Sequence, residues 1–374
     1  MVQIRPEVES FAKIKVIGIG GSGGNAITRM IACKIHGVDF VAINTDAQDL
    51  HHVKAPEKVH IGKNLTKGLG AGMNPEIGRQ AAEENRDEIH QVVKGADMVF
   101  VTCGMGGGTG TGAAPIIAEA AKDSGALTVA VVTKPFTFEG VQRARVAEEG
   151  LNQLRDKVDT LITIPNDRLL SVIDRKTSLL NAFSMVDDVL RQAVQGISDL
   201  VITPGIVNVD FADVKAIMQD AGSALMGIGR ATGEDRAVEA AKAAVNSPLL
   251  EISIDGAKGV LFNVSGGSDL AMAEINEAAK IITESIDPEA KVIFGAVMDD
   301  RLKKGEIKVT VIATGFDEGF LRKSETRIQD ISPMSRGKIE EKNIKKPIAK
   351  PTITPIEEPE DEWDIPAFIR RKMK

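Results

Sequence analysis

Twice before residue 115, the chain runs from an apolar segment into a dense glycine cluster and then into a helical pattern. The first cluster, GIGGSGGN, covers residues 18–25, and the second, GMGGGTGTG, covers residues 104–112. Glycine at such a junction permits positive φ and lets a phosphate approach the backbone, while the helix N-terminus favours the anion. The two clusters therefore predict phosphate binding by backbone N–H groups at two neighbouring turns.

Short apolar runs alternate with helical patterns from residue 13 to about 165. Strands are expected at 14–19, 38–44, 98–103, 127–133 and 160–165, and helices at 25–34, 75–94, 113–123 and 141–157. This alternation predicts an α/β fold with a parallel, Rossmann-like sheet that is covered by helices on both faces. In such sheets, ligands bind beyond the carboxyl ends of the strands.

The remainder of the chain has a different order of elements. Apolar residues at 3–4 spacing predict a long central helix from residue 178, and Pro204-Gly205 ends it. Two helices should follow, and then strands at 260–264, 292–297 and 308–313 with a helix at 270–285, which gives a smaller α+β domain. Prolines and dense charge after residue 316 predict a disordered C-terminal tail. The expected segments are an N-terminal extension (1–12), a nucleotide-binding α/β domain (13–177), the central helix (178–203), the α+β domain (204–316), a disordered linker (317–360) and a terminal peptide (361–374).

Composition excludes several classes of protein. The net charge of −7 argues against a nucleic-acid binder, which needs a basic face. No apolar run approaches the ~18 residues of a membrane span, and no signal peptide precedes the first strand, so we expect a cytoplasmic chain without direct membrane insertion. The spacing of the two cysteines and five histidines matches no metal-binding pattern, so no direct protein ligand to a metal is expected.

The first cluster by itself leaves two interpretations open. Gly18, Gly20 and Gly23 have the spacing of the dinucleotide fingerprint, and Asp46 lies at a suitable distance for a ribose ligand, which would indicate an NAD-dependent oxidoreductase. The second glycine cluster has no place in that fingerprint and favours a different nucleotide. No GxxxxGK[ST] sequence is present, so phosphates would be held without a P-loop lysine. The hydroxyls of Thr109 and Thr111 can add donors there.

Two pairs of residues permit both a structural and a functional interpretation. Asp210 and Asp213 stand at the N-cap and N3 positions of an expected helix, where capping alone explains them. Phe183 lies one helical turn before Asp187, so both side chains project from one helix face. A carboxylate can accept hydrogen bonds from guanine N1–H and its exocyclic amine, and the ring can stack on the base or simply pack in the core.

The segment GGGTGTG, residues 106–112, resembles the signature of the tubulin-like GTPase family, in the form found in bacterial cell division. Further segments are similar to that family's nucleotide loops: GIGGSGGNA, INTDAQDL, GLGAGMNPEIG, KPFTFEG and NAFSMVDDVLRQAVQGISDL. NVDFADV (208–214) resembles the loop that reaches the neighbouring subunit, and DIPAFIRR (364–371) resembles the C-terminal partner-binding peptide.

The resemblance implies GTP and GDP as ligands, with Mg2+ bound through the phosphates. Glu139 and Arg143 would contact ribose and phosphates, and Asn166 with Asp187 would read guanine. The full set of GTP-binding residues implied by the resemblance is Gly20, Gly21, Ser22, Gly23, Gly24, Asn25, Asn44, Ala71, Gly72, Gly104, Gly106, Gly107, Gly108, Thr109, Gly110, Thr133, Pro135, Glu139, Arg143, Asn166, Phe183 and Asp187.

The resemblance also implies GTP hydrolysis in a head-to-tail homopolymer that forms a ring at the division site beneath the membrane. Asp210, Asp213 and Asn208 would act on GTP bound by the adjacent subunit. Membrane-tethering and regulatory division proteins would bind the terminal peptide, through Asp364, Ile365, Pro366, Phe368 and Ile369. A purely structural filament protein is the rival class, and it would lack the carboxylate pair.

Overall fold

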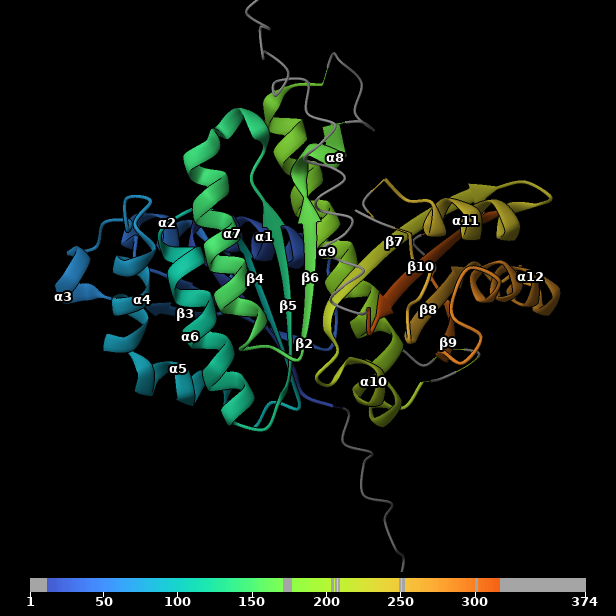
Figure 1. The fold of residues 1–374 in the computed structure, drawn as a ribbon, viewed down its shortest axis with the longest axis horizontal. Coiled ribbons are helices and arrows are strands. Elements are labelled where there is room, and N and C mark those ends of the chain that lie inside the picture. The colour runs from blue at the N-terminus through green and yellow to red at the C-terminus, as the bar shows by residue number, and fades with distance from the viewer. Residues whose placement is uncertain are drawn as a thin grey trace, which may run out of the picture. The chain divides into compact units, whose positions relative to one another are not determined.

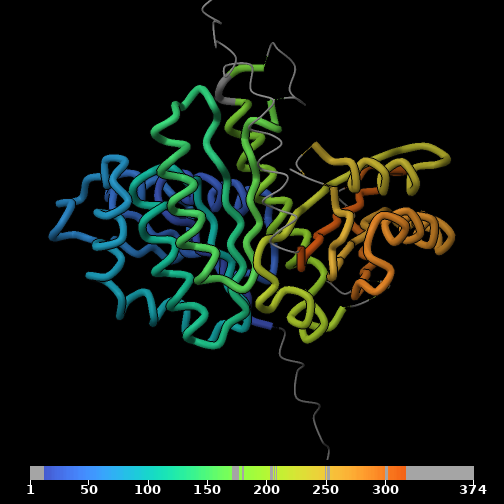
Figure 2. Tube along the Cα trace, in the orientation of Figure 1, coloured from blue at the N-terminus to red at the C-terminus, as the bar shows by residue number. Residues whose placement is uncertain are grey.

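The computed structural model describes residues 12–170, 177–202, 205, 207, 209–248, 250, 253–299 and 302–316. Together they belong to one compact unit. Within them, a single ten-stranded sheet has the order β3-β2-β1-β4-β5-β6-β7-β10-β8-β9 (Figure 1). Figure 2 shows the N-terminal segments, in blue to green, at the left end of the sheet and the C-terminal strands, in yellow to orange, at its right end.

The first six strands are all parallel and follow the 3-2-1-4-5-6 order of a Rossmann sheet. They are β1 (Ile14–Ile19), β2 (Val38–Asn44), β3 (Glu57–His60), β4 (Met98–Gly104), β5 (Leu127–Lys134) and β6 (Thr160–Pro165). Most residues of β1, β2, β4, β5 and β6 are buried on both faces because helices cover both sides, whereas the edge strand β3 is largely exposed. The α/β class expected from the sequence is confirmed.

Two separate apolar cores lie against the two faces of this sheet. The first is formed with α1 (Gly20–Ala32), α9 (Leu179–Ile202) and α10 (Phe211–Met218). The second is formed with α4 (Pro75–Glu84), α5 (Arg86–Val93), α6 (Thr109–Asp123) and α7 (Val141–Arg155). Short elements complete this half: α2 (Ala47–His52), α3 (Lys63–Thr66), a 3-10 turn (Thr137–Glu139) and α8 (Asn166–Leu170).

The C-terminal half is a mixed sheet joined to the first half by one short strand pairing. β7 (Gly222–Thr232) pairs with β6 in parallel only from Thr160 to Ile162, and with β10 (Glu306–Thr314) in antiparallel fashion. β8 (Gly259–Gly266) and β9 (Lys291–Met298) complete the sheet. Helices α11 (Arg236–Val245) and α12 (Met272–Thr283) bury their apolar residues in a third core. None of the described helices combines the length and apolarity needed to cross a bilayer.

Two expectations about secondary structure were wrong, and one strand was not expected. Two consecutive helices were expected after the central helix, whereas β7 lies between α10 and α11. The single helix expected at 75–94 is divided at Asn85, whose side chain accepts a hydrogen bond from the Gly62 N–H (2.9 Å) and donates one to Glu88 (2.9 Å). β3 was not expected at all, because its four residues are too few to show a period.

The start of both glycine-flanked helices also differs from expectation. α1 begins at Gly20 and α6 at Thr109, so most of the first cluster and half of the second form the first helical turns. Low helix propensity of glycine favoured a later start. In the structure, the close contacts that only glycine permits outweigh this propensity.

Glycine at 78 and 112 lets α4 lie directly against the start of α6. A Cβ added to Gly112 would lie 1.9 Å from the carbonyl oxygen of Pro75, and one added to Gly78 would lie 2.3 Å from that of Gly108. Both obstacles are backbone atoms, which cannot rotate away. The two helices are thus held at a separation that fixes the glycine loop before α6.

We expect Gly112→Ala to lower the free energy of unfolding by about 1–3 kcal/mol, because the added methyl overpacks the contact between α4 and α6. Urea denaturation followed by circular dichroism measures this change. Gly107→Ala is the matched control, since an added Cβ there meets nothing within 4 Å. Equal stability of the Gly112→Ala variant and the wild type would show that the helices can separate without cost.

Candidate nucleotide site

The two glycine loops lie side by side at the carboxyl ends of β1 and β4, which are neighbours in the sheet. The backbone N–H of Gly104 donates to Ser22 Oγ (2.7 Å), which links the second loop to the first. A Cβ on Gly20 would lie 3.2 Å from the backbone nitrogen of Gly110. The starts of α1 and α6 therefore form one surface with two helix N-termini, which favours an anion.

The glycines of these loops fall into two classes. Some are required by the fold: Cβ atoms on Gly23 and Gly24 would lie 2.6 Å from the Thr102 carbonyl oxygen and 2.7 Å from Val53 Cγ2. Gly107 is different, because it has an ordinary φ and an added Cβ would meet no protein atom within 4 Å. Packing within the protein therefore does not require glycine at this position. The open space beside Gly107 is consistent with a ligand that approaches the backbone here.

A third loop, residues 68–74, lies against the second. A Cβ on Gly108 would lie 2.8 Å from Ala71 Cβ and 2.9 Å from the Asn74 backbone nitrogen. Gly72 has φ +58° and an open environment, as a loop facing a ligand requires. The structure thus brings Ala71 and Gly72 beside the second glycine loop, as the resemblance implied.

The loop after β2 is held by a network of buried polar groups. Asn44 donates from Nδ2 to Asp49 Oδ2 (2.7 Å), and Thr45 shares a hydrogen bond of 2.7 Å with Thr109. Burial, followed by the charge of Asp46, raises the pKa of Asp49. Asp46 itself is the N-cap of α2, accepting from the backbone N–H groups of Gln48 and Asp49.

Residues expected to contact the sugar and the phosphates lie at the end of β5, on the loop that follows it and in the first turn of α7. The Met105 N–H donates to the Thr133 carbonyl (2.9 Å), and a Cβ on Gly106 would lie 2.8 Å from Arg143 Cγ and 3.5 Å from Pro135 Cγ. Glu139 accepts from the Phe136 N–H (2.9 Å) and pairs with Arg143 (2.9 Å). Thr133, Pro135, Glu139 and Arg143 therefore surround one side of the second glycine loop.

Phe183 and Asp187 lie on α9 beside this loop, one helical turn apart as expected. Phe183 is 41% exposed and packs edge-on against the buried Phe136, at 5.5 Å between ring centroids. Burial raises the pKa of Asp187 to about 6, against an opposing effect of Arg29. A carboxyl group with this pKa, held on a helix beside an exposed ring, is poised to accept hydrogen bonds from a ligand.

Two buried polar atoms at this site have no partner in the described protein. They are Asn166 Oδ1, at the start of α8, and Arg143 Nε. Asn166 is only 5% exposed, so water reaches its side chain poorly. Buried polar groups are rarely left unsatisfied. Both atoms belong to residues expected to contact the nucleotide. A ligand could donate a hydrogen bond to Asn166 Oδ1 and accept one from the Arg143 Nε–H.

The carboxylate pair lies elsewhere. Asp210 caps α10 by accepting from the Ala212 N–H (3.2 Å), so the capping interpretation is confirmed for this residue. Asp213 occupies the third helical position. Both side chains are exposed. In Figure 1, α10 lies at the opposite end of α9 from the carboxyl ends of β4, β5 and β6. Asn208 and the five residues of the terminal peptide (Asp364, Ile365, Pro366, Phe368, Ile369) lie outside the described residues.

Sequence reasoning missed two residues that organise the site. Asp167 accepts from both the backbone N–H (2.9 Å) and the hydroxyl of Thr137, so it fixes the 3-10 turn of the sugar loop. Thr45 holds Thr109 at the start of α6. The partner of each residue lies far away in the sequence, so no local pattern indicated the contact. The signals were the position of Asp167 directly after Asn166 and the position of Thr45 within the segment INTDAQDL.

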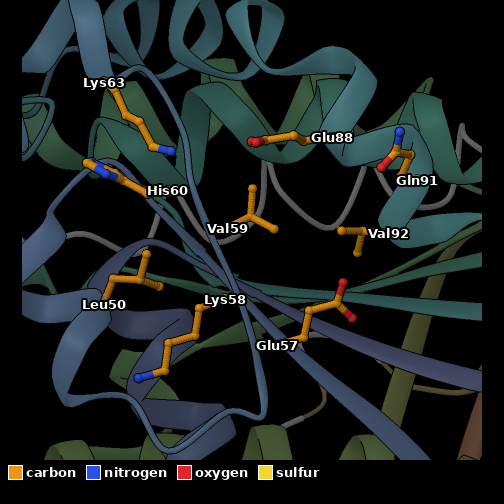
Figure 3. Close-up of a pocket in the computed structure, with 9 residues that line it drawn as sticks. All are labelled: Leu50, Glu57, Lys58, Val59, His60, Lys63, Glu88, Gln91 and Val92. Carbon is orange, nitrogen blue, oxygen red and sulfur yellow. The ribbon is translucent and has the colours of Figure 1, made fainter.

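A cavity of about 480 Å3 lies away from the glycine loops, against the edge strand β3 (Figure 3). Lys63 and Glu88 project into it from opposite sides, and Glu57 and Val92 line its lower part. Its charges are mixed, and Glu57 is within 4.0 Å of Lys15. It contains no residue of the expected nucleotide site.

Comparison with known proteins decides the family. Residues 13–174 match the model of the tubulin/FtsZ family GTPase domain, and residues 222–317 match the FtsZ family C-terminal domain. A solved structure of an empty FtsZ dimer from M. jannaschii is 49% identical, with a TM-score of 0.79, over 82% of this chain and 89% of that chain. The chain belongs to the tubulin/FtsZ family.

More distant members share the fold. CetZ2 from Haloferax volcanii, solved as a GTPγS-bound protofilament, is 22% identical with a TM-score of 0.71 over 85% of this chain and 99% of that one. CetZ1 from the same organism, solved as a GDP-bound monomer, is 22% identical with a TM-score of 0.68, over 85% of this chain and all of that one. The tubulin/FtsZ protein described here is a GTPase, and its nucleotide is a guanine nucleotide. The match to the tubulin/FtsZ GTPase domain overturns the interpretation as an NAD-dependent oxidoreductase.

We expect Gly107→Ala to weaken GTP binding by about 10- to 150-fold. The added methyl projects into the open space of the second loop and keeps phosphate from the backbone N–H groups, and hydrogen bonds to a charged group contribute about 1.5–3 kcal/mol. Calorimetric titration with GTP measures the affinity. Folding should be unchanged, since no protein atom meets the methyl group. Wild-type affinity in this variant would show that phosphate lies elsewhere.

Proposed function

We propose that this GTPase assembles head to tail, and that each contact between subunits completes one active site. The observation that carries the proposal is the placement of Asp210 and Asp213. They are exposed at one end of α9, whereas the glycine loops open at the other end (Figure 1). α9 has 24 residues and is about 36 Å long at 1.5 Å per residue. A carboxylate acting on GTP must lie within hydrogen-bond reach of the attacking water, so the pair acts on GTP held by another subunit.

Exposed apolar residues around the glycine loops support a subunit contact there. Leu69 and Met73 in the third loop are 70% and 48% exposed, and Phe138 and Val141 beside the sugar loop are 60% and 87% exposed. Clusters of exposed apolar side chains mark protein–protein contacts. The CetZ2 relative was solved as a protofilament with GTPγS, which supports the same mode of assembly for this chain.

In this proposal the carboxylates of Asp210 and Asp213, with Asn208, orient the water that attacks the γ-phosphate. The products are GDP and phosphate. The glycine loops hold the phosphates with backbone N–H groups and two helix N-termini, which stabilises charge in the transition state. We propose Mg2+ bound through the phosphates. The described residues contain no group of three or more His, Cys, Asp or Glu side chains that could hold a metal ion.

Guanine recognition is assigned to Asp187, Asn166 and Phe183. The ionised Asp187 carboxylate accepts from N1–H and the exocyclic amine, whereas adenine presents a lone pair at N1. The unpartnered Asn166 Oδ1 gains a donor from the bound nucleotide, and the exposed Phe183 ring stacks on the base. Glu139 and Arg143 contact the ribose and the phosphates.

We further propose the biological role implied by the resemblance: a cytoplasmic filament that forms a ring at the division site beneath the membrane. Residues 361–374 would recruit membrane-tethering and regulatory division proteins. The proposed boundaries stay at 13–177 for the GTPase domain, 178–203 for the central helix and 204–316 for the second domain. The two family models, which cover 13–174 and 222–317, support this division.

The pKa of Asp187 predicts a pH dependence of nucleotide binding. In the free protein its pKa is raised to about 6, so the carboxylate is ionised above that pH and protonated below it. A protonated carboxyl cannot accept both guanine hydrogen bonds, so GDP affinity should be full above pH 6 and fall about tenfold per unit below it. Calorimetric titration with GDP between pH 5 and 8 measures the effect.

Asp187→Asn is the control for this titration. This variant should bind GDP more weakly at every pH, and its GDP affinity should not change near pH 6. Any effect from titration of the GDP phosphates should be the same in both proteins. The same pKa shift has an opposite effect on folding. Since the folded pKa lies above the ordinary value of 3.8, ionisation of Asp187 lowers the stability of the free protein as the pH rises through 6. If the GDP affinity of Asp187→Asn falls below pH 6 as much as that of the wild type, Asp187 does not recognise guanine.

The shared site predicts complementation between two inactive variants. Asp213→Ala should bind GTP and assemble, but hydrolyse about 10²–10⁴-fold more slowly, because a water-orienting group is lost. Gly107→Ala should bind GTP about 10- to 150-fold more weakly, so that at GTP concentrations below its dissociation constant it is largely empty while it still presents Asp210 and Asp213. Mixing the two should restore phosphate release above the sum of the separate rates.

Gly107→Ala is preferable to a variant at Gly108, where a Cβ would lie 2.9 Å from the backbone nitrogen of Asn74 and disturb the third loop. Turnover per wild-type molecule should also fall on dilution. Full turnover by Asp213→Ala, or turnover that is independent of protein concentration, would contradict a site between subunits.

A further inference from the structure

The helix that carries the carboxylate pair is short and is fixed at its far end. α10 has eight residues, with Asp210 and Asp213 at its exposed N-terminal end. Val214, Ile217 and Met218 are buried in the core beneath the sheet. An eight-residue helix is about 12 Å long, so a tilt of about 5° at one end moves the other end by about 1 Å.

Two threonine hydroxyls satisfy the last carbonyl groups of α10. Thr160 Oγ1, at the start of β6, donates to the Met218 carbonyl. Thr314 Oγ1, at the end of β10, shares its proton between the Ile217 carbonyl (3.2 Å) and the Gly259 carbonyl (3.3 Å). Both threonines are at most 1% exposed. The last carbonyls of a helix have no partner within the helix, and side chains or water usually supply one. Here one partner comes from the GTPase domain and the other from the C-terminal sheet.

The turn after α10 is fixed by a buried carboxylate. Asp159, which precedes β6 and is 4% exposed, accepts from the backbone N–H groups of Thr128 (2.8 Å) and Asp220 (3.4 Å). Lys122 contacts both Asp159 (3.1 Å) and Asp220 (2.8 Å). Asp220 has φ +51°, a left-handed conformation that needs such support. The hydrogen bond from Lys122 holds the pKa of Asp220 below its usual range.

β6 therefore connects the two functional ends of the subunit. Its first residue, Thr160, holds α10, and Asn166 follows its last residue, Pro165. Six residues of a parallel strand span about 20 Å and resist bending within a sheet. The strand holds the guanine-binding residue and the anchor of α10 at a fixed separation.

We propose that Thr160 is a positioning residue for GTP hydrolysis: its hydroxyl, with Thr314 and Asp159, sets the orientation of α10 and so the place of Asp210 and Asp213 against the neighbouring subunit's GTP. This inference rests on the proposed function of the carboxylate pair. Thr160 contacts the helix and not the nucleotide. A misplacement of about 1 Å in reacting groups can cost about 100-fold in rate.

Thr160→Val removes the hydroxyl and keeps the side-chain shape. We expect kcat for GTP hydrolysis in filaments to fall about 10- to 100-fold, with the GTP affinity of the subunit unchanged. Thr160→Ser keeps the hydroxyl and should restore most of the rate. Thr128→Val is the matched control: this buried threonine lies on the neighbouring strand, its hydroxyl donates only to the nearby Ala126 carbonyl (3.1 Å), and kcat should be unchanged.

A double variant separates positioning from general damage. In the Asp213→Ala background, Thr160→Val should lower kcat by a smaller factor than in the wild type, because one of the two carboxylates it positions is already absent. The same loss in both backgrounds, an equal loss in Thr160→Ser, or a matching loss of GTP affinity would overturn the proposal. If circular dichroism shows that Thr160→Val does not fold, Asp220→Ala is the variant to test. This substitution removes the ion pair of the exposed Asp220 side chain with Lys122, which supports the same turn, and should lower kcat several-fold. Wild-type kcat in Asp220→Ala would then overturn it.

The outcome also distinguishes this inference from the proposed function. Full turnover by Asp213→Ala would remove the carboxylate pair from catalysis and the positioning role with it. Loss of turnover in Asp213→Ala together with wild-type kcat in Thr160→Val would support the shared site and reject only the positioning role of Thr160.

Discussion

The contact between the two glycine loops is the constraint on which the rest of the site depends. The loops approach closely: a Cβ on Gly20 would lie 3.2 Å from the Gly110 backbone nitrogen, and the Gly104 N–H donates to Ser22 Oγ (2.7 Å). Because small residues line this contact, two helix N-termini converge on one space and present their N–H groups to it. In the proposed site, these N–H groups hold the phosphates without a P-loop lysine.

The nucleotide site is built with interactions that remain incomplete until a ligand arrives. Asn166 Oδ1 and Arg143 Nε are buried without partners, and burial raises the pKa of Asp187 to about 6. Each of these features lowers the stability of the free protein, since buried polar groups without hydrogen bonds are costly. In the proposed complex, a guanine nucleotide satisfies all three, so its binding would recover that free energy and stabilise the fold. Selectivity follows from the same features, because a ligand without the matching donors leaves them unsatisfied.

The length of β6 and α9 separates the two halves of the reaction. Both elements run from the carboxyl edge of the sheet, where the nucleotide site lies, towards the end that holds α10 (Figure 1). A rigid sheet and a long helix allow no bending that would bring Asp213 to the glycine loops of its own subunit. In the proposed assembly this separation links hydrolysis to polymerisation: a lone subunit binds GTP and cannot turn it over. The exposed Phe138 and Val141 beside the nucleotide loops would be covered only when the active site is complete.

The sequence by itself determined five of the six strands of the parallel Rossmann-like sheet, the long central helix and the two glycine-rich turns. These signals are local, since continuous apolar runs, 3–4 spacing and glycine clusters need no knowledge of distant contacts. The roles of Asp187, Glu139 and Arg143 remain predictions from a family resemblance. Tertiary structure alone decided which glycines serve packing and which serve the ligand, because Gly107 and Gly108 are neighbours in sequence and differ only in what surrounds them. It alone revealed β7, whose glycines make sense only against the backbone of α11, and the anchors Asp167 and Thr160, which bond to residues 30 and 58 positions away. Such contacts depend on how distant segments pack, and no local pattern records them.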